Sequence, residues 1–306
     1  MSPSDDHGHF PWSPIVARPR LRWPSDAGLA RCAIISLQCF ETDPPPDSHQ
    51  ARILAGGLGL RPHPDVPMLS SREYGHRVGL FRIVPLLERY GLAPTIAMDA
   101  LTAERYPFIV DYCLNRGLEI IGHGISATQI ITSEMSVSRE RQYVSESLQR
   151  LSTATGQEVR GWMSPEYSES PATPQILAEN DVEYVCDWAN DEQPYRMSGL
   201  AGDLISIPIT LDCDDAYALG TMSLSLTSYS SRIVTTCKRL VEDGRTIARS
   251  FVLVLRPWLI GQPFRVSALE EALEQTQGWP GVVSGSAGDI AKWYVAGGAH
   301  ARAEGA

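Results

Sequence analysis

The sequence predicts an α/β protein whose parallel strands curl into a barrel, and three observations lead to this prediction. Short apolar runs alternate with longer amphipathic runs, the order expected of repeated strand–helix units. The chain has 306 residues, which suits one large α/β barrel. It carries no glycine-rich nucleotide-binding motif and no internal repeat. A doubly wound open sheet is the alternative.

Eight short apolar runs are predicted as strands. The first contains Cys32-Ala33-Ile34-Ile35, and the run from residue 251 is the most apolar of the set. The predicted strands are residues 31–37, 95–97, 118–122, 161–163, 184–186, 204–208, 251–256 and 281–284.

Seven longer runs between these strands are predicted as helices from their apolar faces. Ser170-Pro171 reads as an N-cap followed by proline at the first helical position. Ser267 and Glu270 have the spacing of a capping box. The predicted helices are residues 75–90, 101–116, 138–154, 171–180, 229–243, 267–277 and 287–295.

One barrel domain is expected over residues 31–296. Residues 1–30 are rich in proline and aromatic residues and are expected to form an extended lead-in. Residues 297–306 are expected to be a flexible tail. Within the domain, the proline- and glycine-rich residues 43–71 are predicted as a long loop, and loops of that length are often functional.

Composition excludes several classes of protein. The net charge is −10 and no Lys/Arg cluster occurs, so no nucleic-acid partner is expected. No apolar run reaches the roughly 18–20 residues of a membrane helix, and the first residues lack the pattern of a secretory signal. The six cysteines lack CxxC spacing, which indicates reduced, packed thiols. A cytoplasmic location is therefore expected.

Active sites of parallel barrels lie at the carboxyl ends of the strands, and this rule nominates the site residues. His123 follows the strand 118–122 between two glycines, which permit close approach of a ligand. It is predicted to be the catalytic base or to orient water. A structural histidine is the alternative.

Glu41 and Asp212 are the predicted proton partners of His123. Glu41 follows the first strand, and Asp212 begins the acidic run Asp212-Cys213-Asp214-Asp215. A carboxyl group buried there would acquire a raised pKa and serve as an acid or a base. Solvated surface charge is the alternative for both residues.

Seven further residues near strand ends are predicted to bind the substrate. Gln38 can hydrogen-bond the edge of an amide or imide, and Arg256 can hold a carboxylate or stabilise an oxyanion. Packing inside the barrel is the alternative for the tryptophans. The remaining five are Ser164, Glu166, Trp188, Trp258 and Asp214.

No spacing of histidines typical of a zinc site is present, so no cofactor is predicted. A weak divalent metal site at His123 with neighbouring carboxylates is left open.

Several motifs, in their order and spacing, resemble the polysaccharide deacetylase superfamily with NodB homology. Within it, they are similar to the branch of metal-independent allantoinases and cyclic imide hydrolases. The resemblance covers residues 10–295 and implies a distorted (β/α)7-8 barrel, a cytoplasmic homo-oligomer and hydrolysis of a C–N bond in a small amide, ureide or cyclic imide. The motifs include Trp12-Ser13-Pro14-Ile15, Glu73-Tyr74-Gly75-His76-Arg77-Val78-Gly79, the stretch from Glu119 to Gly124, Asp187-Trp188-Ala189-Asn190 and Leu259-Ile260-Gly261-Gln262-Pro263.

Two positions depart from the pattern that the resemblance implies. Relatives in this branch tend to have an acidic residue where Gln38 stands and a histidine where Arg256 stands. The metal-dependent deacetylases use an aspartate pair and two histidines, of which only His123 is matched. Three hypotheses follow, in order of preference: a metal-independent hydrolase, a repurposed enzyme catalysing a lyase, isomerase or cyclisation step, and a non-catalytic binding protein.

Overall fold

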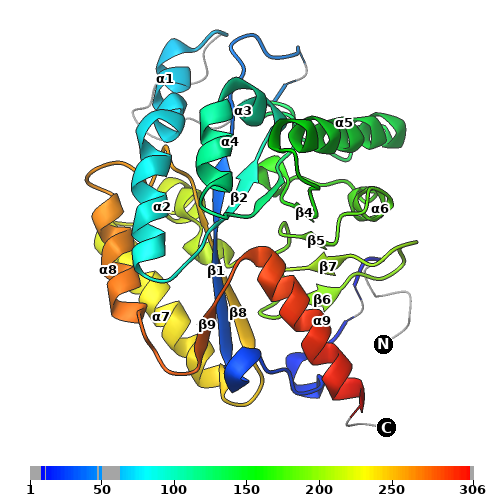
Figure 1. Ribbon diagram of the computed structural model, residues 1–306, viewed down its shortest axis with the longest axis vertical. Helices are drawn as coiled ribbons and strands as arrows, with labels where there is room; N and C mark the ends of the chain where they lie inside the picture. The colour runs from blue at the N-terminus through cyan, green and yellow to red at the C-terminus, as the bar shows by residue number, and fades with distance from the viewer. Residues whose placement is uncertain (1–7, 11, 47, 50–62, 304–306) are drawn as a thin grey trace.

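The computed structural model describes residues 8–10, 12–46, 48–49 and 63–303, and its centre is one curled, mostly parallel sheet (Figure 1). The strand order is β6-β7-β5-β4-β3-β2-β1-β8, with β9 beside β1. The pairing of β6 with β7 is antiparallel, and the other pairings are parallel. The strands are β1 (Leu29–Leu37), β2 (Thr95–Met98), β3 (Ile120–Gly122), β4 (Gly161–Trp162), β5 (Tyr184–Val185), β6 (Tyr195–Arg196), β7 (Ile205–Ser206), β8 (Arg249–Leu255) and β9 (Val282–Ser284).

All eight predicted strands are present, and the sequence analysis missed only the two-residue β6 among the described strands. The sheet curls, but connecting segments bridge its two edges in place of paired strands. Thr210 donates its N–H to Val252 O of β8 at 3.1 Å, and Ser250 of β8 donates its N–H to Glu192 O at 2.7 Å. The result is the predicted distorted barrel and not the open doubly wound sheet.

Helices cover the outside of the sheet (Figure 1). All seven predicted helical segments contain helix, and the segment 101–116 is divided at Pro107, which cannot continue the preceding helix. The helices are α1 (Val66–Tyr74), a π-helical turn (Gly75–Gly79), α2 (Leu80–Arg89), α3 (Ala100–Arg105), α4 (Pro107–Leu114), α5 (Val137–Thr155), α6 (Thr173–Glu179), α7 (Leu226–Gly244), α8 (Val266–Thr276) and α9 (Ala287–Ala303).

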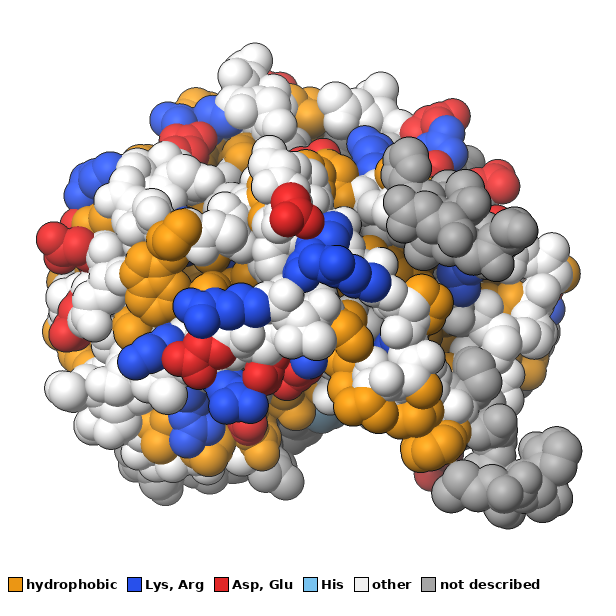
Figure 2. Space-filling view, turned by 90° about the horizontal axis from the view of Figure 1, so that it is seen from below, with side chains coloured by type: hydrophobic (Ala, Val, Ile, Leu, Met, Phe, Trp, Pro, Cys, Tyr) orange, Lys and Arg blue, Asp and Glu red, His pale blue; other side chains and the backbone are white. Residues whose placement is uncertain are grey.

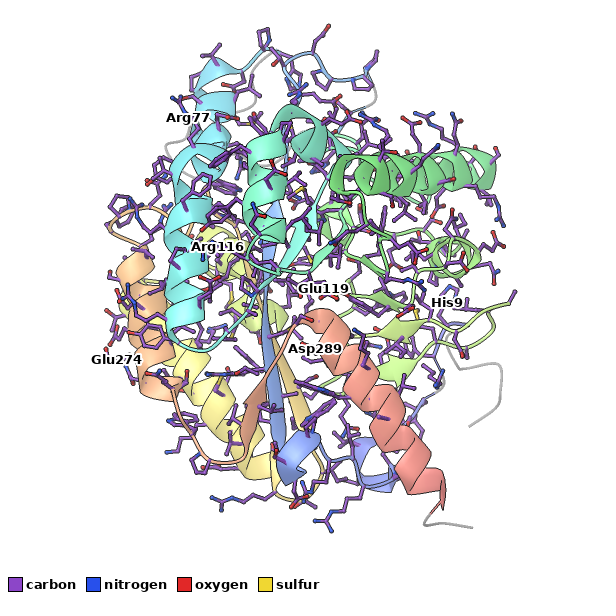
Figure 3. The ribbon with its side chains drawn as sticks, viewed as in Figure 1. His9, Arg77, Arg116, Glu119, Glu274 and Asp289 are labelled. Carbon is purple, nitrogen blue, oxygen red and sulfur yellow. The ribbon has the colours of Figure 1, made fainter. Side chains whose placement is uncertain are left out.

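The two predicted helix caps are wrong in detail. α6 begins at Thr173 with Ala172 as its N-cap. The hydroxyl of Ser170 accepts from the Ala172 N–H in the turn that precedes the helix. α8 begins at Val266, so Ser267 lies inside the helix and donates its hydroxyl to Phe264 O at 3.2 Å. The first turn of α9 is held by a side chain from a distant part of the sequence. Glu119 accepts from the Gly288 N–H at 3.0 Å (Figure 3).

Helix also occupies parts of two segments that were expected to be irregular. α1 lies in the predicted loop 43–71, where the carboxylate of Asp65 accepts from the Met68 N–H at 3.2 Å. Residues 50–62 of that loop lie outside the described residues. At the other end, α9 runs on to Ala303, through most of the predicted tail 297–306.

The core has two layers because β1 is buried along its whole length. Leu29, Ile35 and Leu37 face the helices, whereas Cys32 and Ile34 face the barrel interior. A parallel strand buried on both faces is expected to be a continuous apolar run, as β1 is. All six cysteines are free and buried, as predicted for reduced thiols.

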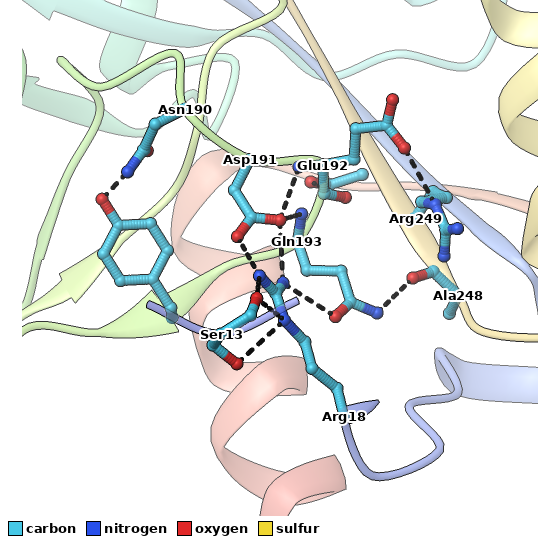
Figure 4. A network of polar contacts seen from close by, with 10 residues as sticks. Ser13, Arg18, Asn190, Asp191, Glu192, Gln193, Ala248 and Arg249 are labelled. Atoms are coloured by element: carbon cyan, nitrogen blue, oxygen red, sulfur yellow. Dashed lines mark hydrogen bonds and ion pairs between the residues drawn. The ribbon is translucent and has the colours of Figure 1, made fainter. Parts of the chain in front are cut away.

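The lead-in, predicted within residues 1–30, is fixed near the start of β8 by polar contacts (Figure 4). The Arg18 guanidinium donates to both carboxylate oxygens of Asp191, at 2.8 and 2.5 Å. It also donates to Gln193 Oε1, and Gln193 in turn donates to Ala248 O at 2.5 Å. Residues 1–7 and 11 lie outside the described part of the chain.

The surface is mixed in charge. On the face shown in Figure 2, Lys and Arg side chains alternate with Asp and Glu side chains and with apolar ones. No helix among the described residues is long and apolar enough to cross a membrane.

Candidate active site

The residues that follow β7 and β8 meet in a buried ion cluster. Arg256 Nη1 donates to Asp214 Oδ2 at 2.7 Å and to Asp215 Oδ1 at 3.2 Å, and the Arg256 backbone N–H donates to Asp215 Oδ2 at 2.7 Å. The Tyr167 hydroxyl donates to the same oxygen of Asp214. Burial raises the pKa of Asp215, and the adjacent guanidinium opposes that rise. The structure therefore brings together two predicted site residues, Arg256 and Asp214.

Asp212 does not join this cluster. The 3-10 turn Leu211–Cys213 directs it outward, so that its side chain is 73% exposed and lies 3.9 Å from Arg232. The acidic run is thus divided: Asp214 and Asp215 are buried against Arg256, and Asp212 is the solvated charge named as the alternative.

His123 is buried at the end of β3, with 1% of its surface exposed. Nδ1 contacts Met163 O, which requires a proton on Nδ1, and Nε2 then accepts from the Ser36 hydroxyl at 2.9 Å. Burial lowers the pKa of His123 to about 4, so the ring is neutral at pH 7. The hydrogen bonds of His123 go to Met163 and Ser36, and not to Glu41 or Asp212, the two predicted proton partners.

Glu41 lies beyond the end of β1 and is bound by the loop that follows His123. Its carboxylate accepts from the Ser126 hydroxyl at 2.8 Å, from the Thr128 hydroxyl, and from Gln129 Nε2 at 3.2 Å. These contacts tie two loops together at the carboxyl end of the sheet.

A pair of carboxyl groups lies at the ends of β4 and β5. Asp187 Oδ1 accepts from the Ser164 N–H at 2.7 Å, and Glu169 Oε1 accepts from Trp188 Nε1 at 3.3 Å. Among the described residues, the other oxygens, Asp187 Oδ2 and Glu169 Oε2, have no partner outside this pair. Burial raises the pKa of both groups, that of Asp187 to about 6, and a side-chain hydrogen bond joins them, so the pair retains one shared proton.

His123 reaches this pair through one peptide group. Its Nδ1–H donates to the carbonyl of Met163, and the N–H of the same peptide unit, that of Ser164, donates to Asp187. The Ser164 hydroxyl accepts from Trp162 Nε1 at 2.8 Å and fixes the segment from the other side. His123 and Ser164 therefore position Asp187.

A cavity of about 770 Å³ lies beside the end of β1 and includes Gln38 and Arg72 in its wall. Gln38 is 5% exposed, and its Nε2 has no hydrogen-bond partner among the residues that the structure describes. Arg72 on α1 is 6% exposed, and within the described part of the chain its Nε and Nη1 have no hydrogen-bond partner. The Arg72 guanidinium stacks on the ring of Trp258, with Cζ 3.3 Å from the ring centroid.

The two remaining predicted residues, Trp188 and Glu166, lie at the margin of the site. Trp188 packs edge-on against Phe10 of the lead-in, with ring centroids 5.5 Å apart. Glu166 is exposed, and it and Tyr167 both have positive φ, 55° and 56°. Residues other than glycine rarely adopt this conformation, and such strain gathers at functional sites. Here it accompanies the contact of Tyr167 with Asp214.

Five residues of the site are not among the predicted site residues: Asp187, Asp215, Tyr167, Glu169 and Arg72. Tyr167 and Glu169 belong to the polar loop after the predicted strand 161–163, and the strand-end rule extended over the whole loop would have included them. Arg72 directly precedes the motif from Glu73 to Gly79 and lies between the predicted loop 43–71 and the predicted helix 75–90. No sequence signal indicates that its charge would be buried.

These residues do not fit the metal site of the deacetylases described above. Gln38 offers a neutral amide where a carboxylate is expected, and both ring nitrogens of His123 are engaged by protein groups. In the part of the chain that the structure describes, no three His, Cys, Asp or Glu side chains gather in an arrangement that could hold a metal.

Comparisons with known proteins agree with this fold. Residues 73–185 match the family model described as polysaccharide deacetylase. PuuE allantoinase matches with a TM-score of 0.83 at 23% identity, over 91% of this chain and 94% of that one. A probable polysaccharide deacetylase from Pseudomonas aeruginosa PAO1 matches with a TM-score of 0.82 at 23% identity, over 92% and 97%. No curated protein sequence matches. The chain therefore carries a segment that matches the polysaccharide deacetylase family model and shares the distorted-barrel fold of these two structures.

Proposed function

We propose that this chain hydrolyses a non-peptide C–N bond in a small cyclic imide, ureide or amide, without a metal. The fold shared with PuuE allantoinase supports C–N bond hydrolysis. The side chains at the strand ends, which do not fit a metal, support a reaction carried by protein groups. The buried carboxyl pair is the observation that carries the proposal.

The Asp187–Glu169 pair has the protonation that hydrolysis requires. A general base works best when its pKa lies near the working pH, and burial raises the pKa of Asp187 to about 6. Glu169 remains protonated beside it because burial and the charge of Asp187 raise its pKa. One carboxylate and one carboxylic acid thus stand together, as in other enzymes that use two carboxyl groups.

The reaction follows from these two states. The Asp187 carboxylate takes a proton from water as the water oxygen bonds to the carbonyl carbon. The C–N bond then breaks, and Glu169 gives its proton to the leaving nitrogen. Transfer of the proton from Asp187 to Glu169 restores the pair. His123 serves as a positioning residue in this scheme, because it fixes the peptide group that binds Asp187.

The test is ring opening by purified, chelator-treated protein. We expect turnover with one or more members of a panel of imides, hydantoins and ureides, followed by ultraviolet absorbance and mass. Asp187→Asn should lower kcat about a hundredfold or more, since a general base contributes that much. In wild type, activity should fall as the pH drops below about 6, where Asp187 becomes protonated. Asp203→Asn, at an exposed carboxylate paired with Arg196, is the control and should keep wild-type activity.

A second candidate is a repurposed enzyme that catalyses a lyase, isomerase or cyclisation step. Arg256 favours it, because a guanidinium bound by two carboxylates cannot transfer protons as the expected histidine would. The same panel separates the two. No turnover by wild type, even with zinc added, together with ring opening by the double variant Gln38→Glu/Arg256→His, would contradict hydrolysis and support this candidate.

A further inference from the structure

The cavity beside β1 contains a buried cation with no anion bound to its free donors. Arg72 is 94% buried by the rest of the chain, and its Nε and Nη1 have no hydrogen-bond partner among the described residues. Aromatic rings hold it in place: Cζ lies 3.3 Å from the centroid of Trp258 and 4.9 Å from that of Phe40. A buried charge is costly unless it is paired, so this guanidinium is preorganised for an anion that the described residues do not supply.

The nearest protein carboxylates do not fill that role. Asp215 and Glu166 act on Arg72 at a distance, but Asp215 is hydrogen-bonded to Arg256 and Glu166 is exposed. Glu73, in the cavity wall, accepts from the Tyr106 hydroxyl at 2.8 Å and pairs with His76. Burial lowers the pKa of Arg72 only to about 10, so it remains charged at pH 7.

The wall of the cavity is positive although the chain as a whole has a net charge of −10. Its charged side chains are Arg72, Arg77, Arg105 and Glu73. Arg77 lies at the end of the molecule where β1 ends (Figure 3). A cavity of this sign attracts anions and repels cations.

Gln38 adds a second free donor to the same wall. Its Nε2 is buried and has no partner in the described ranges of the chain, and the residue directly follows β1. A guanidinium and an amide N–H in one cavity are suited to the two oxygens of a carboxylate. Such an arrangement would also explain why Gln38 is not acidic, since a carboxylate in its place would repel the ligand.

We propose that the substrate carries a carboxylate, which Arg72 and Gln38 bind in this cavity. The proposal rests on the proposed function and names the class of substrate: a cyclic imide or ureide with an acidic substituent. The carboxylate meant is the one present before the reaction, and not the one that ring opening creates. Arg72 and Gln38 are binding residues that set specificity.

Binding of matched ligands by calorimetry tests this proposal without requiring turnover. The probes are hydantoin-5-acetate with its neutral amide, and succinate with succinamide for the case that the ring does not fit. We expect wild type to bind the carboxylate of one pair or both roughly ten- to a hundredfold tighter than the amide. Arg72→Met should abolish the preference, and Arg72→Lys should keep part of it. Arg89→Met, at an exposed pair with Glu270, is the control and should keep all of it.

Gln38→Leu provides an independent variant if Arg72→Met does not fold, as judged by circular dichroism, and it should reduce the preference several-fold. Equal affinity of acid and amide, no binding of either carboxylate, or a preference that survives both variants would overturn the proposal. Carboxylate preference without ring opening of any substrate would overturn hydrolysis and leave the carboxylate site standing. Ring opening of acidic and neutral substrates at equal kcat/KM would support hydrolysis and overturn the carboxylate site.

Discussion

At the scale of single residues, burial decides which groups are charged. His123 and Asp187 are joined through the Met163–Ser164 peptide, yet burial drives their pKa values in opposite directions. Burial disfavours the charged form of each, so His123 loses its proton and the carboxyl pair retains one. A neutral imidazole that positions a proton-sharing carboxyl pair is the result.

The pKa of His123 predicts how stability depends on pH. The unfolded chain binds this proton with a pKa near 6.5 and the folded chain with a pKa of about 4. The contribution of His123 to stability is therefore complete above pH 6.5 and is lost as the pH falls toward 4. Between pH 7 and 4.5, wild type should lose about 2 to 3 kcal/mol more unfolding free energy than His123→Gln. Urea titrations at the two pH values measure this, and equal losses would show that His123 is not held neutral.

At the scale of elements, two helices and one turn place the cavity. α1 and α2 flank a π-helical turn whose Gly79 lies against Pro257, in the turn after β8. Gly261 approaches both of them, so three backbones meet where no side chain fits. This close approach brings α1, and with it Arg72, against Trp258.

Filling that contact should be costly. A Cβ at Gly79 would collide with the carbonyl of Pro257, and overpacking of this kind typically costs about 1 to 3 kcal/mol. We expect Gly79→Ala to lower the unfolding free energy, measured by urea titration, by about 2 kcal/mol. The variant should also bind a ligand of Arg72 with lower affinity. Gly202→Ala is the matched control, since its Cβ would meet Ala178 at an ordinary 3.4 Å. Equal stability of the two variants would refute the close contact.

At the scale of the whole molecule, the lead-in contacts a segment that bridges the two edges of the sheet. Arg18 of the lead-in binds Asp191 in the segment that follows β5 (Figure 4). Ser250 of β8 donates its N–H to Glu192 O of the same segment. Arg18 and Asp191 are the centre of this contact, with side chains 17% and 12% exposed. The lead-in therefore supports the same segment that begins with Asp187 and Trp188.

Removing this contact should destabilise the whole fold. A largely buried two-point ion pair is worth more than a surface pair, and its loss leaves Asp191 unpaired. Arg18→Met should lower the unfolding free energy by about 2 kcal/mol, in one cooperative transition. Arg239→Met, which removes an exposed pair with Asp243, should leave stability unchanged. Separate unfolding of the lead-in, without change in the main transition, would contradict this account.

The sequence by itself determined the barrel, because local signals specify its parts. Eight apolar runs and seven amphipathic runs were sufficient to predict the strands, the helical segments and the strand ends at which Gln38, His123 and Arg256 lie. α1 was missed because Pro67 and the glycines before it resemble loop punctuation, although Asp65 caps the helix.

Only the tertiary structure decided how the polar residues combine. The sequence placed Asp212 and Asp214 together, and a single 3-10 turn exposes the first and buries the second. Two contacts form only when the elements pack. Arg72 meets Trp258, which is far from it in the sequence, and Glu169 meets Asp187, although no sequence motif joins them. Charge state and pairing depend on burial, and burial is a property of the assembled molecule and not of local sequence.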